Sequence, residues 1–329
     1  MPNIHKLAKF ILYADDANII LTGANAHEII SKYRELSTVL SNWVACNGLM
    51  LNVRKTNYML FSNVNIGDFS SYKPTINNIP IERKRVTKFL GVLIDEKLQW
   101  AHHIKSLSTK MSRNCGILYK MKGILPPKAM LTLYHSFIQS HLNYCSLIWG
   151  LGSKNSIKAL FVCQKKAMRT LIPGYVNYYY NKTSKEPPNH TKQAFNENKI
   201  LIVHSLILKN LMLFMHKLNY HAHLIPDGII EIFPSSTTES ENIEVLTERL
   251  VSEANSMFVK GLRLYSEVMI EATEADPLLH TPILGSFKNR LKLHLLSIQS
   301  KGSGTEWDPE NFRLCIQKAK RKSPRLNTI

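Results

Sequence analysis

Two adjacent carboxylates near the start of the chain, Asp15 and Asp16, have the types and the spacing that metal chemistry requires. They lie between two apolar runs, Phe10 to Leu12 and Ile19 to Leu21, which predicts a β-hairpin with the acids at its tip. Mg²⁺ prefers hard oxygen ligands and is often held by one or two carboxylates together with substrate phosphates. The pair is therefore a candidate divalent-metal site, and the alternative is a solvated Asp-Asp turn.

The segments after the hairpin would have to position it. Apolar residues at steps of three and four predict an amphipathic helix over residues 27–47, which ends at Asn47-Gly48. Four short strands are expected next, at 49–53, 57–61, 76–81 and 86–94. A turn containing Arg54, Lys55 and Thr56 separates the first two strands.

Beyond residue 100 the strand-like runs give way to helical periodicity. Pro126-Pro127 predicts the start of one of these helices, because proline is tolerated in the first helical turn. The expected helices cover residues 104–121, 126–145, 157–171, 196–220, 244–272 and 284–299.

The charge of the chain favours a polyanionic partner. The net charge is +18 and the pI is about 9.6. From Lys97 to Lys185 the sequence has no Asp or Glu but carries 14 Lys and Arg residues. Ordinary solvated surfaces mix the two signs, so this block predicts contact with nucleic acid, with an anionic membrane surface as the lesser option. Its basic residues form two groups: Lys105, Lys110, Arg113, Lys120, Lys122 and Lys128, and then Lys154, Lys158, Lys165, Lys166 and Arg169.

The remaining composition is that of a globular intracellular protein. Five scattered cysteines show no C-x-x-C pair and no zinc spacing, which favours reduced thiols. His102-His103 has no further His or Cys spaced to complete a zinc site. The short apolar run at the N-terminus leads into two acids and is no signal peptide, and polar residues break the apolar stretch 200–218. We expect a chain in the cytoplasm, the nucleus or both, without a transmembrane segment.

Three segments in this order resemble motifs of reverse transcriptases, and of non-LTR (LINE-type) retrotransposons in particular. Tyr13-Ala14-Asp15-Asp16-Ala17 and the strand after it resemble the metal-binding motif of that family. Residues 48–56 resemble its next motif, of the form G-L-x-L-N-x-x-K-T, and residues 89–95 resemble the primer-grip motif. The likeness covers about residues 1–175 well and the final fifth loosely.

The resemblance implies an α+β fold. A partial polymerase palm of antiparallel strands plus a helix would span residues 1–95, and a basic helical thumb would span 96–175. A linker would follow at 176–195, and a C-terminal helical region of unknown role at 196–329.

The resemblance also implies roles for individual residues. Asp15 would be a metal ligand, with Asp16 beside it, for Mg²⁺ or Mn²⁺ in a two-metal phosphoryl transfer. Lys55 would donate a proton to the pyrophosphate, and its alternative is a solvated lysine in a turn. Tyr13 would lie beside the primer terminus, and Phe89, Leu90 and Gly91 would form the primer grip. The expected partners are an RNA template and a DNA primer or duplex, contacted by the basic helices through Lys105, Lys110, Arg113, Lys120, Lys122, Lys165, Lys166 and Arg169.

The sequence departs from the family pattern in one respect. A further Asp on an upstream strand, together with the fingers, would normally precede the hairpin. We therefore expect a 5′-truncated fragment that is inactive as a polymerase by itself. The alternatives are a non-catalytic RNA- or DNA-binding protein that uses the basic thumb, an inert relic, and a helical protein-interaction module built from residues 196–300. The aromatic residues between the basic ones (Tyr119, Tyr134, Phe137, Tyr144 and Trp149) fall on apolar stripes, which predicts that they are core residues.

Overall fold

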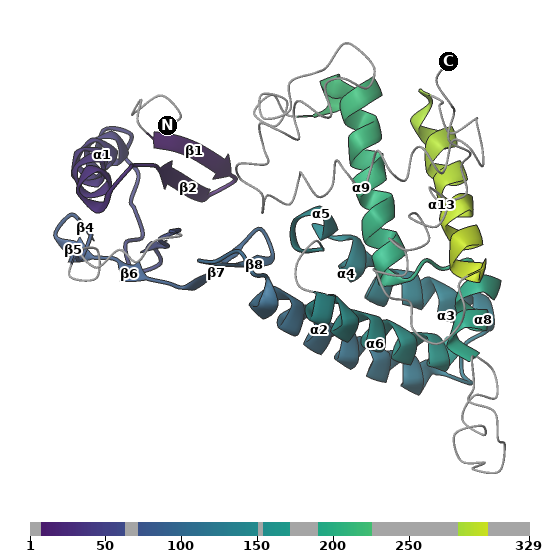
Figure 1. Ribbon diagram of the computed structural model, residues 1–329. Coiled ribbons are helices and arrows are strands. Elements are labelled where there is room, and N and C mark those ends of the chain that lie inside the picture. The colour runs from purple at the N-terminus through teal and green to yellow at the C-terminus, as the bar shows by residue number, and fades with distance from the viewer. Residues whose placement is uncertain (1–7, 63–71, 151–153, 172–189, 226–281, 302–329) are drawn as a thin grey trace, which may run out of the picture. The chain divides into compact units, whose positions relative to one another are not determined.

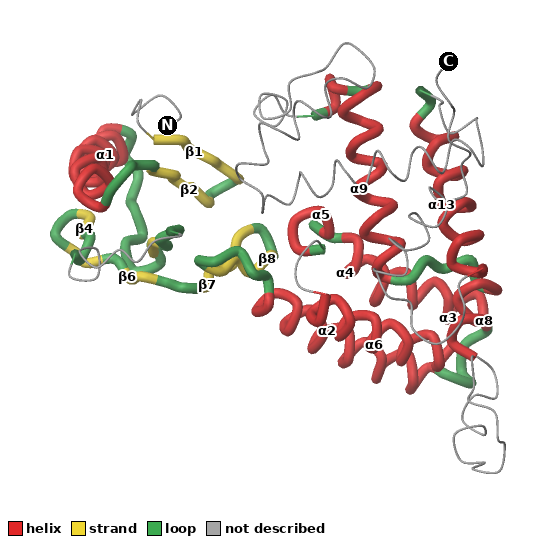
Figure 2. Tube along the Cα trace, viewed as in Figure 1, coloured by secondary structure: helices red, strands yellow, loops and turns green. Residues whose placement is uncertain are grey.

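A computed structural model of the chain describes residues 8–62, 72–150, 154–171, 190–225 and 282–301 (Figure 1). The chain divides into two compact units, with the boundary between residues 102 and 103. The fold mixes helix and sheet, as expected (Figure 2). Among the described residues, the strands all belong to the first unit. The linker predicted at 176–195 lies outside the described residues as far as residue 189, and so does the helix predicted at 244–272.

The strands of the first unit are short and associate in pairs. The hairpin predicted around the two acids is confirmed, with β1 (Ala8–Tyr13) antiparallel to β2 (Asp16–Leu21). The other pairs are β3 (Asn57–Tyr58) parallel to β6 (Glu82–Arg83), and two antiparallel pairs, β4 (Thr75–Ile76) with β5 (Ile79–Pro80) and β7 (Val86–Phe89) with β8 (Val92–Asp95).

Two of the predicted strands are in fact hairpins. Asn77 and Asn78 both have positive φ, 51° and 61°, so residues 76–81 turn back on themselves. Leu90 and Gly91, with φ of 44° and 85°, do the same between β7 and β8. Positive φ at both central residues is typical of the tightest hairpin turns, and Asn and Gly tolerate it well. The strand predicted at 49–53 was wrong too, because these residues are irregular.

The helix predicted for residues 27–47 is confirmed as α1 (Ala26–Cys46). Its buried face includes Leu36, Leu40 and Val44, and Gly48 follows with φ of +64°. A small separate core gathers Val53, Ile76 and Ile81, with Tyr33 of α1 packed against it. The Tyr33 hydroxyl donates a hydrogen bond to the Thr75 carbonyl at 3.1 Å, and burial raises the pKa of this tyrosine to about 12.

The second unit is helical where it is described. Its long helices are α2 (Ala101–Met121), which starts at the boundary, α6 (Lys154–Leu171), α9 (Val203–Tyr220) and α13 (Leu284–Lys301). These confirm the helices predicted at 104–121, 157–171 and 284–299. The shorter elements are α3 (Pro127–Tyr134), the π-helix η2 (His135–Gln139), α4 (Ser140–Asn143), α5 (Ser146–Trp149), α8 (His190–Glu197) and the 3₁₀ turn η3 (Ala222–Leu224).

The single helix predicted at 196–220 is divided, because α8 ends at Glu197 and α9 begins at Val203. Two buried glutamines hold the chain between them. Gln164 of α6 accepts from the Val203 N–H at 2.8 Å and donates to the Leu201 carbonyl at 3.0 Å. Gln299 of α13 accepts from the Ile202 N–H at 3.2 Å and donates to the Ile200 carbonyl at 3.2 Å. Side chains from α6 and α13 thus replace the missing helical hydrogen bonds at the start of α9.

Two further properties of the described residues bear on the expectations above. None of the described helices combines the length with the apolar composition that a bilayer crossing needs. The cysteines in the described part are free thiols: Cys115 and Cys163 are buried, Cys145 is half-buried and Cys46 is exposed. Burial raises the pKa of the Cys115 thiol to about 11, so this side chain is an inert core residue.

Candidate active site and nucleic-acid interface

The two carboxylates of the hairpin lie at its tip. Tyr13 and Asp16 form the last pair of the ladder, and Ala14 and Asp15 make the two-residue turn. Ala14 has φ of +50°, a conformation that costs a non-glycine residue about 1 kcal/mol. Asp15, Asp16 and Tyr13 are all exposed. Because cross-strand partners share a face, Tyr13 lies beside Asp16.

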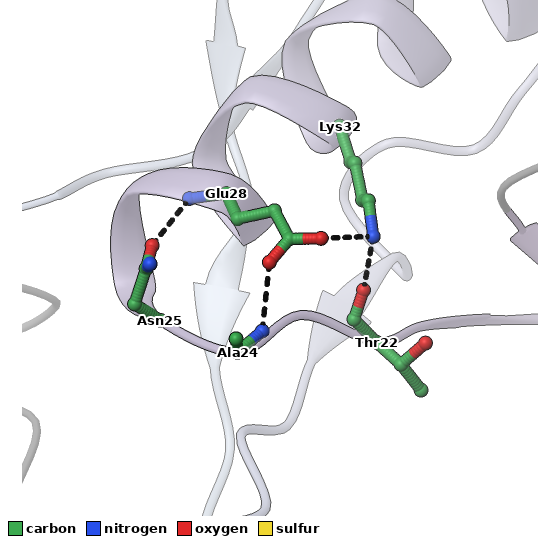
Figure 3. Close-up of polar contacts among 5 residues, drawn as sticks. All are labelled: Thr22, Ala24, Asn25, Glu28 and Lys32. Carbon is green, nitrogen blue, oxygen red and sulfur yellow. Dashed lines mark hydrogen bonds and ion pairs between the residues drawn. The ribbon is translucent and has the colours of Figure 1, made fainter.

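A polar network connects the end of the hairpin to the start of α1 (Figure 3). Asn25 caps the helix by accepting from the Glu28 N–H at 2.9 Å, and Glu28 in turn accepts from the Ala24 N–H at 2.8 Å. This reciprocal arrangement satisfies donors that would otherwise have no partner at a helix N-terminus.

Lys32 extends the same network back to the hairpin. Its ammonium lies 2.6 Å from Glu28 and donates to the Thr22 carbonyl at 2.7 Å, just after β2. The hydrogen bond from Lys32, then the one from Ala24, lowers the pKa of Glu28. Gly23 also allows a close approach, since a Cβ there would lie 2.8 Å from Cγ1 of Ile29. These contacts fix the direction in which the chain runs from β2 into α1.

The turn that carries Lys55 is built by Asn52. The Asn52 carbonyl accepts from the N–H groups of Lys55 and Thr56, both at 3.1 Å, and from the Thr56 hydroxyl at 3.0 Å. Its side-chain oxygen also accepts from the Lys55 N–H at 3.2 Å. Val53 anchors the turn in the small core, which leaves the Lys55 side chain exposed. Local hydrogen bonding thus accounts for Asn52 and Thr56 in the order N-x-x-K-T, and Lys55 takes part through its backbone.

The predicted primer-grip residues occupy the β7–β8 hairpin. Phe89 is the last residue of β7 and pairs with Val92, while Leu90 and Gly91 form the exposed turn. Gly91 is therefore a turn residue. At the far end of β8, the buried Asp95 accepts from the N–H groups of Lys97, Gln99 and Trp100 at 3.2, 3.0 and 2.8 Å.

The carboxylates at the hairpin tip suit a hard cation by type and by exposure. Together they can offer at most a few of the oxygen ligands that Mg²⁺ requires. Across the described ranges, no three His, Cys, Asp or Glu side chains gather as metal ligands. Lys55 lies on a separate turn of the same unit. The structure therefore places the hairpin, the lysine turn and the β7–β8 turn on three separate loops.

The predicted nucleic-acid contacts of the second unit lie on α2, on α6 and in the turn after α2. Lys105, Arg113 and Lys120 lie on the face of α2 opposite its buried residues, and Lys110 is exposed beside them. On α6, Lys166 is exposed, Arg169 is half-buried and the Lys165 ammonium lies 4.7 Å from the centre of the Phe161 ring. Lys122 is half-buried, and burial lowers its pKa.

Direct contacts join α2 to α6. The Ser108 hydroxyl lies 3.2 Å from the Cys163 thiol, and the Cys115 thiol donates to the Cys163 carbonyl at 3.6 Å. Both helices therefore contribute basic residues to the same unit, and Glu197 of α8 is the single acid among the described residues from 103 onward.

The prediction that the intervening aromatics are core residues is confirmed for Tyr134 and Trp149, which are fully buried. It was wrong for Tyr119 and Tyr144, which are 61% and 53% exposed. Tyr119 follows the fully buried Leu118 on α2, so it falls to the side of the buried stripe of this helix.

Comparison with known proteins identifies relatives among transposon polymerases. The chain is 24% identical over 187 residues to a probable RNA-directed DNA polymerase from transposon X-element of Drosophila melanogaster, a match that covers 55% of this chain and 20% of the relative. It is 22% and 24% identical to RNA-directed DNA polymerases from mobile element jockey of Drosophila melanogaster and Drosophila funebris, in each case over 48% of this chain and 17% of the relative. The chain is thus similar in sequence to RNA-directed DNA polymerases of transposons and other mobile elements.

This chain spans a fifth or less of the length of the curated polymerases that it matches. No family model matches it. No solved structure matches it either.

Sequence reasoning missed two residues that organise the polymerase-like segments. Asn52 builds the Lys55 turn, and an Asn three residues before a Lys-Thr pair is the signal that could have indicated it. Asp95 was given no role of its own within residues 89–95, yet its carboxylate accepts from three backbone N–H groups between β8 and α2. An Asp shortly before a helix is a capping signal, since a capping side chain accepts from N–H groups two or three residues further along. Asp95 reaches further than a usual cap, because it also accepts from the N–H groups of Gln99 and Trp100.

Proposed function

We propose that the chain is a portion of a retrotransposon reverse transcriptase that carries the metal-binding hairpin, the lysine turn, the primer grip and the thumb. The observation that carries this proposal is the exposed Asp15-Asp16 pair at a hairpin turn, followed in order by the Asn52-built turn and the β7–β8 hairpin. The relationship to transposon polymerases supports it. The reaction is RNA-templated addition of a deoxynucleotide to a primer 3′-hydroxyl.

Each residue has a defined task in that reaction. Asp15 and Asp16 would hold a divalent cation, Mg²⁺ or Mn²⁺, and such a cation would supply Lewis acidity for the attacking hydroxyl and the leaving pyrophosphate. Lys55 donates a proton to the departing pyrophosphate oxygen. Tyr13, Phe89, Leu90 and Gly91 hold the primer terminus, and Gly91 lets a backbone approach closely. The basic side chains of α2 and α6 hold the template and primer through their phosphates.

We further propose that this chain does not extend a primer by itself. Two-metal catalysis needs more oxygen ligands than a single pair of neighbouring carboxylates provides. Preorganised ligands supply most of the rate in such reactions, so an incomplete set leaves little activity. The short span of the chain relative to the polymerases it matches is consistent with ligands supplied elsewhere.

The first experiment is extension of an oligo(dT) primer on poly(A) by this chain with Mg²⁺ or Mn²⁺. We expect no product. Extension that is lost on Asp15→Ala would contradict the proposed inactivity and place a complete site within the chain.

The second experiment asks whether the segment works in a complete enzyme. Residues 8–171 replace the matching region of a jockey polymerase, and circular dichroism verifies that the chimera folds. We expect extension, and a loss of at least about 10²-fold with Asp15→Asn. Glu82→Gln, which changes an exposed acid of the same unit, is the control and leaves the rate unchanged. Equal rates for Asp15→Asn and Glu82→Gln would reject the assigned metal site.

The nearly acid-free surface of α2 and α6 favours a second candidate, a non-catalytic RNA- or DNA-binding protein. In that case binding is strongly salt-dependent and is unaffected by Asp15→Ala. Reversing the charges of Lys165, Lys166 and Arg169 would weaken it. Binding with these properties, together with an inactive chimera, would favour this candidate over the polymerase.

A further inference from the structure

Helices α9 and α13 carry a second group of basic residues, none of which was assigned to polymerase function. They pack antiparallel along their whole lengths (Figure 1). The His216 and Phe287 rings stack with their centres 4.1 Å apart, and His221 Nε2 donates to the Pro282 carbonyl at 2.9 Å. At the other end of the pair, Gln299 accepts from the Ile202 N–H.

Three lysines lie along this helix pair, and the register set by the His216–Phe287 and Ile202–Gln299 contacts places Lys209 opposite the turn of α13 that carries Lys292. Lys209 lies midway along α9, between Ile202 and His216, and its side chain is half-buried. Lys288 and Lys292 lie one turn apart on α13, and residues at this spacing share a helix face. Both are exposed. Burial lowers the pKa of Lys209, and the charges of Lys288 and Lys292 lower it further. We call these three residues the α9–α13 lysine cluster.

The cluster has no counter-ion in the described part of the protein. Glu197, on α8, is the single acid described from residue 103 onward. Gathering like charges and partly desolvating one of them costs free energy in the isolated protein. Such costs are characteristic of sites that bind an oppositely charged ligand.

We propose that the α9–α13 lysine cluster binds the phosphate backbone of a nucleic-acid strand, as a contact additional to α2 and α6. Lysine ammonium groups bind phosphates as point charges, and the net charge of +18 steers a polyanion towards the chain. This inference goes beyond the proposed polymerase role. It requires that the chain binds nucleic acid, and it requires neither catalysis nor the contacts on α2 and α6.

The test measures binding of a fluorescein-labelled oligo(U) strand to the full chain by fluorescence anisotropy over a range of salt concentrations. Lys209→Met keeps the apolar stem and removes the charge. We expect weaker binding, with the slope of log K against log salt reduced by about 0.7, the value for one phosphate contact with a single strand. Lys288→Glu with Lys292→Glu reduces the slope by at least twice that amount. Because Lys209→Met relieves repulsion, we expect its thermal midpoint to equal or exceed that of the unaltered chain.

The control is Lys217→Met, which removes a charge from the last turn of the same helix. It leaves both the affinity and the slope nearly unchanged. An equal loss with Lys217→Met, or no loss with either cluster variant, overturns the proposal in favour of a diffuse charge effect. A lower thermal midpoint with tighter oligo(U) binding also overturns it, because the acid-rich residues 226–281 of the chain would then be the occupant.

Different results would reject nucleic-acid binding by the α9–α13 lysine cluster and the polymerase proposal. Substitutions of Lys165, Lys166 and Arg169 test the α6 contact in the same assay, and primer extension by the chimera tests catalysis. Loss of binding with the α6 substitutions but not with the cluster variants would reject the cluster alone.

Discussion

The two units of the chain differ in how their interiors and their charges are arranged. The largest fully buried side chains, Trp149, Tyr134 and Phe195 among them, all belong to the helical unit. In the first unit the apolar residues of the hairpin remain accessible: Leu12 and Ile20 are 44% and 45% exposed. The register places Leu12 and Ile20 on opposite faces of the hairpin, and a two-stranded sheet buries little of either face on its own.

The two units also differ in the signs of their charged residues. The first unit mixes signs and forms ion pairs, such as Arg83 with Glu96 at 3.1 Å. The described part of the helical unit has one acid and holds its core together with apolar contacts and buried glutamines. In the described part of the helical unit the cations therefore far outnumber the acids, which favours a polyanionic partner.

The largest expected effect concerns the core of the helical unit. Trp149→Ala removes a fully buried ring that contacts His103 and whose Nε1 donates to the Tyr144 carbonyl at 2.8 Å. We expect a loss of about 3–5 kcal/mol in the free energy of unfolding, measured by urea titration with circular dichroism. Ile20→Ala in the exposed hairpin should cost no more than about 0.5 kcal/mol. Similar costs for the two substitutions would remove the contrast between the units.

The next effect tests the buried glutamine. Gln164→Leu strands the Val203 N–H, the Leu201 carbonyl and the Tyr134 hydroxyl, to which Gln164 donates at 2.9 Å. We expect a loss of about 2–3 kcal/mol, because each unsatisfied buried group costs about 1–3 kcal/mol and some rearrange. Gln193→Leu, on the exposed face of α8, is the matched control and should be nearly neutral. The same urea titration measures both. An unchanged free energy of unfolding with Gln164→Leu would show that the hydrogen bonds of Gln164 are dispensable.

A third prediction compares the cations of the two units. Replacing Lys105, Arg113 and Lys120 by Gln should reduce the salt slope of duplex binding by up to about 2.7, since each phosphate contact contributes about 0.9. Replacing the exposed Lys9, Lys73 and Arg85 of the first unit removes the same charge. We expect a much smaller change there. Equal changes, measured by anisotropy with a labelled RNA–DNA hybrid, would mean that total charge rather than the α2 face governs binding.

The smallest expected effect is a pH dependence from His103. Burial, and then the charge of Lys110, lowers the pKa of this histidine in the folded chain. The unfolded chain therefore binds more protons below about pH 6.5, so stability falls as the pH drops from about 7 and levels off below the folded pKa. His103→Gln should reduce the difference in thermal midpoint between pH 7.5 and pH 5.5. His102→Gln, at an exposed neighbouring position, should leave that difference intact, and the opposite ranking would contradict the assignment.

Periodicity was a good guide to the long helices and a poor one to the short strands. The stripe from Ile104 to Leu118 predicted α2 because every turn repeats the same apolar spacing. Residues 76–81 were misjudged because Asn77-Asn78 in an apolar run signals a turn that hydropathy alone does not register. The break before α9 was missed for a different reason, since its hydrogen-bond partners come from Gln164 and Gln299, distant in sequence.

The features of the candidate site also fall into those set by local sequence and those set by tertiary packing. Local chemistry in the sequence determined the Asp15-Asp16 hairpin and the order of the motifs, because a turn and its flanking strands are specified by neighbouring residues. Tertiary structure decided which side chains remain accessible: it buried Tyr134 and Trp149, exposed Tyr119 and Tyr144, and brought Lys209 to the lysines of α13. Burial and charge proximity depend on contacts between segments far apart in the chain, and a linear pattern carries no information about those contacts until the helices are packed.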